Sequence, residues 1–92
     1  MDVRIKLIGP MQWDIIALDP NSDSETVLAT FPHNNGAIRH AVAVAAVSLA
    51  YELRGRVHIS CTSHFVKVEM RRHLLNAVAA FGLPVHSTLG AV

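Results

Sequence analysis

Three residues near a predicted strand have the types and spacing from which a chemical site could be built. They are His58, Cys61 and His64, and histidine nitrogens and cysteine thiolates are ligands that zinc prefers. Side chains alternate between the two faces of a strand, so we expect His58 and Cys61 to point in opposite directions. The sequence offers no evident fourth ligand, and no third group to orient a Cys61–His64 pair for nucleophilic catalysis. We therefore predict neither a zinc site nor a cysteine nucleophile at this place.

Basic residues on a predicted helix are a second candidate site. Lys67, Arg71 and Arg72 fall on its polar side, where they could bind phosphate groups. The formal net charge is only +1 at pH 7, which gives no strong field for nucleic acid or for a membrane surface. A solvated helix face is the simpler interpretation, and phosphate binding is the alternative. Four carboxylates near the second hairpin are interpreted as a solvated rim or an acidic contact patch: Asp14, Asp19, Asp23 and Glu25.

The composition sets the frame in which such residues must be placed. Of the 92 residues 51% are hydrophobic and 16% are charged, which predicts one domain, residues 1–92, with a single buried core. The single cysteine excludes an internal disulfide and fits a reducing compartment, so we expect a cytoplasmic protein. The longest apolar run, residues 41–51, is too short to cross a bilayer, so we expect no membrane partner.

The N-terminal third of the sequence predicts three strands. Residues 3–8 alternate between apolar and basic side chains, and residues 13–18 and 26–31 are rich in β-branched and aromatic types. A Gly9-Pro10 turn and a polar loop connect these segments. Because both connections are short, we expect a three-stranded antiparallel meander.

A long central helix is predicted next. Asn34 or Asn35 can cap its start, and Gly55 suits the left-handed position that ends a helix. A second apolar flank, which includes Tyr51, predicts that the helix is covered on two sides. The residues expected on its main core-facing side share a helical spacing: Ile38, Val42, Ala45, Leu49 and Leu53.

The rest of the chain predicts a fourth strand and a second helix. Residues 57–61 alternate as a strand does, whereas residues 65–70 fit either a strand or a helix. We prefer the helix, because Thr62 or Ser63 can cap it and the Gly82 to Pro84 segment can stop it. Residues 85–87 could add a short C-terminal strand, or else form a loose end. The sequence thus predicts an α+β or α/β domain in the order βββαβα.

This order resembles the first two-thirds of the ribonuclease H-like fold. Local sequence adds to the resemblance. Residues 32–35, PHNN, look like the proline-histidine and paired-asparagine stretch that precedes the central helix of the family. Residues 60–66, SCTSHFV, look like its serine-aspartate-serine-glutamine-tyrosine-valine segment, where the fourth strand passes into the next helix. Trp13, which opens the second strand, also fits. The resemblance implies the ribonuclease H-like fold.

The family's metal-binding carboxylates have no counterparts at the matching positions. Two-metal cleavage of a phosphodiester needs anionic oxygens around both cations. Matched residue by residue, the first-strand aspartate falls at Ile8 or nearby at Leu7, the central-helix glutamate at Ile38 and the fourth-strand aspartate at Thr62. The resemblance therefore implies a non-catalytic relative that is not an enzyme and that uses no metal and no cofactor.

Two functions from different classes follow. The first is an interaction module that binds a protein partner and inhibits or scaffolds it, as small phage and mobile-element inhibitors do; a homo-oligomer is also possible. The second is a non-catalytic protein that binds a nucleic-acid duplex or hybrid. It would use Lys67, Arg71 and Arg72 together with Asn34 and Asn35, which match the position where the family touches its duplex.

Overall fold

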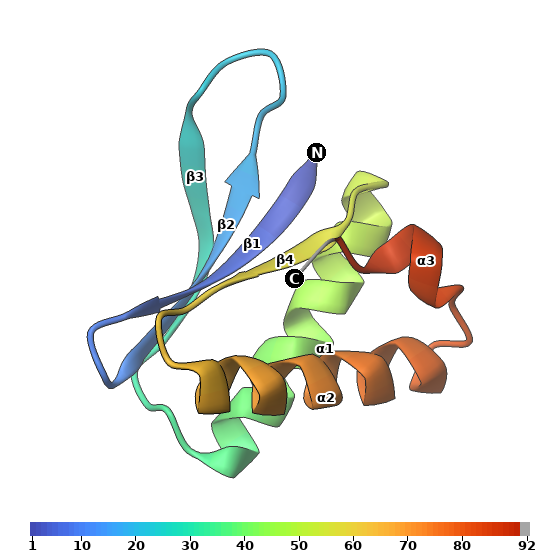
Figure 1. Ribbon diagram of the computed structural model, residues 1–92. Helices are drawn as coiled ribbons and strands as arrows, with labels where there is room; N and C mark the ends of the chain where they lie inside the picture. The colour runs from blue at the N-terminus through green and yellow to red at the C-terminus, as the bar shows by residue number, and fades with distance from the viewer. Residues whose placement is uncertain (91–92) are drawn as a thin grey trace.

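The computed structural model describes residues 1–90. Its elements follow the predicted order βββαβα, and one further short helix comes last (Figure 1). The prediction of a possible strand at residues 85–87 is wrong, because these residues form a helical turn in which Ser87 N donates to Pro84 O at 3.2 Å. The elements are β1 (Asp2–Ile8), β2 (Gln12–Leu18), β3 (Glu25–Phe31), α1 (Gly36–Leu53), β4 (Val57–Ser60), α2 (His64–Ala80) and α3 (Val85–Thr88).

The four strands form one mixed sheet in the order β3-β2-β1-β4. The first three strands are antiparallel neighbours, which confirms the predicted meander, and β4 lies parallel to β1. Ile5 of β1 stands between Ile15 and Ile59 in the register, and all three are buried on one face of the sheet. Buried residues of α1 and α2 belong to the same hydrophobic cluster, so both helices cover this face.

The face that α1 buries is made of small residues. Its fully packed side chains are those of Val42, Ala43, Ala46, Val47 and Ala50. The predicted core-facing side was therefore only partly right: Val42 is buried, but Ile38, Ala45, Leu49 and Leu53 are half-buried, and Tyr51 of the predicted flank is exposed. Alanines at the contact allow α1 to approach both β1 and α2 closely. Whether a residue of α1 is buried therefore depends on whether it faces β1 or α2, more than on the size of its side chain.

By length and composition α1 could also span a membrane, although the core helix of a globular protein passes the same test. Because α1 packs against the sheet and against α2, we interpret it as a core helix.

The C-terminus of α1 differs from the prediction by one residue. Arg54, with φ 55°, takes the left-handed position that was expected for Gly55. Gly55 is needed for a different reason: a Cβ atom at this position would lie 1.7 Å from the carbonyl oxygen of Met1. The N-terminal residue thus passes directly over the turn that follows α1, and its ammonium group donates to Leu53 O at 3.2 Å.

Residues 65–70 belong to a helix, as preferred from the sequence. Ser63 caps α2, with Oγ accepting from Val66 N at 3.4 Å, and Gly82, with φ 69°, lies in the turn that follows. The buried residues of α2 face α1 and the sheet: Met70, Leu74, Ala77 and Val78.

The described C-terminal residues lie against β4. Leu89 forms an isolated parallel bridge with Val57, and Gly90 N donates to Val57 O at 2.9 Å. A Cβ atom on Gly90 would lie 2.1 Å from the imidazole of His58, so any other residue here would have to displace that ring. The first residues of β4 are therefore paired on their outer side.

We expect the substitution Gly55→Ala to lower the free energy of unfolding by about 1–3 kcal/mol, because an additional atom is forced against packed backbone. Gly36→Ala is the matched control, since nothing lies within 4 Å of its Cβ position. Alanine at this first residue of α1 should be neutral or stabilising by about 0.5 kcal/mol. Urea unfolding followed by circular dichroism measures both values, and equal stability of the two variants would contradict the packing described here.

Candidate functional site

Two of the three positions that the sequence resemblance matches with metal ligands of the ribonuclease H-like fold lie near the carboxyl ends of parallel strands. β1 and β4 are neighbours with Lys6 opposite Ser60, so Ile8 and Thr62 follow at the same end of the sheet, both exposed. Ile38 lies in the first turn of α1, half-buried against the core. None of these three side chains carries a negative charge. Across residues 1–90 no three His, Cys, Asp or Glu side chains gather in a way that could hold a metal ion.

The spaced residues His58, Cys61 and His64 are not brought together. His58 Nε2 lies 2.8 Å from Asp2 Oδ2, on the sheet. Cys61 is half-buried, and its Sγ lies 3.5 Å from the carbonyl oxygen of Ser63. His64 is exposed at the start of α2. These side chains therefore have separate environments.

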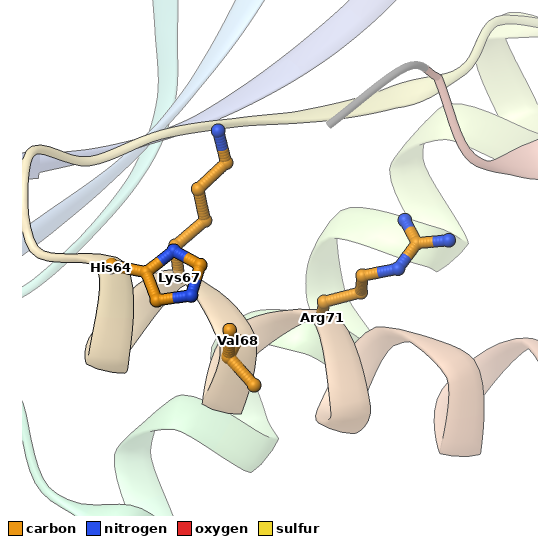
Figure 2. A pocket seen from close by; sticks show the side chains of 4 residues that line it. All are labelled: His64, Lys67, Val68 and Arg71. Carbon is orange, nitrogen blue, oxygen red and sulfur yellow. The ribbon is translucent and has the colours of Figure 1, made fainter.

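Two of the three predicted cations share one side of α2. Lys67 and Arg71 line a shallow open groove together with His64 and Val68 (Figure 2). Neither cation forms an ion pair with a carboxylate among residues 1–90. Sequence reasoning did not include His64 in this group, although its spacing of three residues from Lys67 and seven from Arg71 places it on the same helix face.

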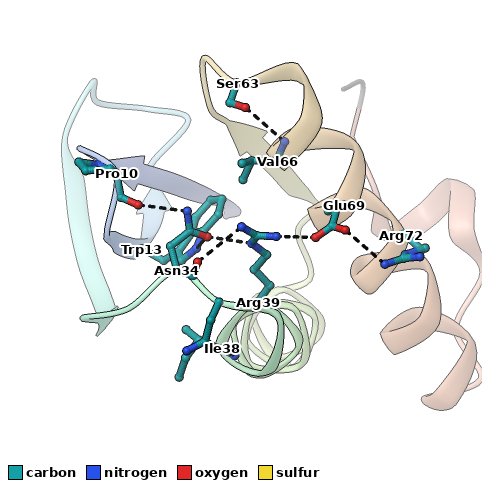
Figure 3. Close-up of polar contacts among 10 residues, drawn as sticks. Pro10, Trp13, Asn34, Ile38, Arg39, Ser63, Val66, Glu69 and Arg72 are labelled. Carbon is teal, nitrogen blue, oxygen red and sulfur yellow. Dashed lines mark hydrogen bonds and ion pairs between the residues drawn. The ribbon is translucent and has the colours of Figure 1, made fainter.

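A polar network joins the sheet to both long helices (Figure 3). Trp13 Nε1 donates to Asn34 Oδ1 at 3.0 Å, and Arg39 Nε donates to the same oxygen at 2.8 Å. Arg39 then forms an ion pair with Glu69 of α2. The Arg39 side chain is only 14% exposed, so water and salt screen this pair less than a surface pair. Arg72, the third predicted cation, lies at the rim of the network, with Nη2 3.6 Å from Glu69 Oε1.

Asn34 and Asn35, which the nucleic-acid hypothesis places at the duplex, both form hydrogen bonds within the protein. Asn34 Nδ2 donates to Pro10 O at 3.1 Å, in addition to the two bonds that its oxygen accepts. Asn35 is the N-cap of α1, with Oδ1 accepting from Ile38 N at 3.0 Å, which confirms one of the two predicted caps. These bonds explain both residues by local structure and leave Asn34 little capacity for an external ligand.

The Asp2–His58 pair is a polar contact that sequence reasoning missed. Arg56 N donates to Asp2 Oδ1 at 2.9 Å, and this backbone hydrogen bond is the main cause that holds the pKa of Asp2 below its ordinary value of 3.8. The bond to His58 acts in the same direction. The two residues are 56 positions apart in the sequence, and only the parallel pairing of β1 with β4 brings them together.

Besides the Arg39–Glu69 ion pair, a contact between two histidine rings joins the two long helices. The rings of His40 on α1 and His73 on α2 meet edge to face, with centroids 5.9 Å apart. Burial is the main cause that lowers the pKa of His73 below 6.5, and the neighbouring Arg72 lowers it further. Both effects favour the neutral imidazole, as expected for a packing contact between helices.

The carboxylates near the second hairpin make local contacts. Asp14 Oδ1 accepts from Thr30 Oγ1 at 3.0 Å and from Gln12 Nε2 at 3.1 Å. Glu25 forms an ion pair with Arg4 at 3.1 Å. Such contacts are typical of a solvated sheet surface, and they support the interpretation of these carboxylates as a solvated rim over that of an acidic contact patch.

The comparisons with protein-family models, with curated proteins and with solved structures find no match for this chain. The function is therefore inferred from the residues and the geometry described here.

We expect Arg39→Ala to lower the free energy of unfolding by about 2 kcal/mol, because it leaves Glu69 and the Asn34 oxygen short of a partner in a shielded site. Arg72→Ala is a matched control, since Arg72 contacts the same glutamate but its side chain is 67% exposed. Its loss should cost less than about 0.5 kcal/mol. Chemical unfolding of both variants measures the difference, and an equal effect would show that the network is not a main tie between the helices.

Proposed function

We propose that this protein is a non-catalytic interaction module of the ribonuclease H-like type that binds a protein partner and so inhibits or scaffolds it. The order of its strands and helices agrees with the resemblance in sequence. At the positions that match the family's metal ligands, Ile8, Ile38 and Thr62 offer no anionic oxygen for a divalent cation. These features support the family resemblance and the lack of catalysis, but they do not yet point to a partner.

The observation that carries protein binding is the exposed edge of β3. This strand ends the sheet, and no other strand among residues 1–90 pairs with its outer side. It contains no lysine and no proline, the residues with which proteins commonly protect such an edge. Val27 is 55% exposed and Leu28 is 39% exposed, so apolar side chains accompany the free backbone groups. A partner strand could bind there through backbone hydrogen bonds and gain specificity from these side chains.

A β-bulge limits how such pairing can occur. The register changes from Ile15 opposite Ala29 to Ile16 opposite Val27, so Leu28 has no partner on β2. A bulge bends a strand and increases its twist, and this discourages the stacking of many copies along a flat edge. The edge therefore favours one short partner strand over open-ended association.

The nucleic-acid alternative has less support. Asn34 and Asn35 are engaged within the fold, and Arg72 contacts Glu69. Lys67 and Arg71 remain as the predicted cations without a carboxylate partner in the described part of the chain. Two such cations and a net charge of +1 provide little of the phosphate neutralisation on which affinity for a duplex depends.

Val27→Lys should block the β3 edge, because a charge on an edge strand opposes pairing with another strand. We expect wild-type protein to capture a protein partner from lysate of the native host, identified by mass spectrometry, and the variant to recover at least about tenfold less of it. Hydrogen exchange of the purified complex should show new protection of the backbone amides in β3.

The matched control is Tyr51→Lys, which makes the same type of change at a residue that is 66% exposed on α1. It should capture the partner as the wild type does. Equal capture by Val27→Lys, or capture that disappears on nuclease treatment, would contradict binding of a protein at the β3 edge.

A further inference from the structure

We infer that the first two turns of α2 form a second docking surface, which binds an acidic amphipathic helix of a partner protein. This surface consists of His64, Phe65, Lys67, Val68 and Arg71, and we call it the α2 surface. The inference goes beyond the strand edge proposed above. β4, against which α2 packs, and β3 lie at opposite edges of the sheet, so the α2 surface is separate from the β3 edge.

Two large apolar side chains give the α2 surface its anchors. Phe65 is 68% exposed and Val68 is 53% exposed, and neither belongs to the hydrophobic core cluster. Residues three apart on a helix lie on the same side, so the two side chains are neighbours. Aromatic side chains and arginine are enriched at protein interfaces, and the α2 surface presents one of each, Phe65 and Arg71.

The charge of the α2 surface defines the chemistry of the partner. Lys67 and Arg71 line one groove together with Val68 and His64 (Figure 2). Glu69, the only acidic residue of α2, forms ion pairs with Arg39 and Arg72. No carboxylate among residues 1–90 neutralises Lys67 or Arg71. A partner that covers Val68 would bury these cations, so it must supply carboxylates of its own.

The shape of the surface favours a helix as the occupant. His64, Lys67 and Arg71 are spaced by three and four residues along α2, so the imidazole and the two cations form a row about 10 Å long beside the Phe65–Val68 pair. A partner helix with acidic side chains at the same spacing, next to an apolar stripe, matches both rows at once. A phosphate backbone would satisfy the cations but would leave the two apolar side chains without an apolar contact.

The test uses a synthetic helical peptide with leucines along one stripe and glutamates beside it, labelled with fluorescein. Its affinity for the whole protein is measured by fluorescence anisotropy at about 50 mM and about 300 mM NaCl. We expect saturable binding that weakens with salt. Phe65→Ala should weaken it about tenfold, as the loss of a central aromatic anchor does.

A charge swap identifies the contact itself. The double variant K67E/R71E should lose the acidic peptide and gain a matched peptide in which lysine replaces each glutamate. R54E/R56E changes the net charge equally at exposed residues outside the α2 surface and should bind as the wild type does. Val27→Lys should also keep the peptide, which separates this inference from the proposal for β3.

The inference is overturned if the acidic peptide does not bind at about 1 mM. Binding that is insensitive to Phe65→Ala, or that R54E/R56E abolishes equally, would also overturn it, because net charge alone would then explain the affinity. A single-stranded or duplex oligonucleotide that displaces the peptide and binds Phe65→Ala as tightly as the wild type would replace it with phosphate binding.

Discussion

The ion pair between Arg39 and Glu69 is the contact on which the arrangement of the helices depends. Arg39 also donates to Asn34, whose side-chain oxygen accepts the indole N–H of the fully buried Trp13. A buried donor without a partner is costly, so the loop before α1 cannot move away from the sheet unless Trp13 loses its bond. The pair thus fixes the start of α1 against β2 and holds α2 beside α1.

The same constraint determines which side of α2 remains free, whereas the order of the strands leaves β3 at an edge. One side of α2 packs into the core and Glu69 is held by arginines. This leaves Phe65 and Val68 exposed, next to two cations that pair with no carboxylate among residues 1–90. At the other edge of the sheet, β3 keeps its outer backbone groups unpaired within the described part of the chain. The two proposed surfaces are separate and differ in chemistry, so together they would hold two partners or two parts of one partner, which agrees with the proposed scaffolding.

Periodicity predicted the elements well, because each depends on residues close together in sequence. The alternation around Ile5 predicted β1, and the paired asparagines Asn34 and Asn35, one of which is the cap, predicted the start of α1. Contacts between distant segments could not be predicted in this way. Arg39 and Glu69 are 30 residues apart, and no local pattern indicates that they meet. The left-handed residue after α1 was misplaced because the passage of Met1 over Gly55, a contact made by the fold, was unknown.

The candidate site was predictable only in part. The lack of carboxylates at Ile8, Ile38 and Thr62 could be read directly from the sequence, whereas the roles of Asn34 and Arg72 depended on partners from other elements. The proposal of a ribonuclease H-like module without catalysis is tested most directly by an assay of purified protein on an RNA–DNA hybrid with Mg²⁺ or Mn²⁺. We expect no cleavage above the blank without protein. Metal-dependent turnover that rises in proportion to protein concentration and co-elutes with the chain would contradict it.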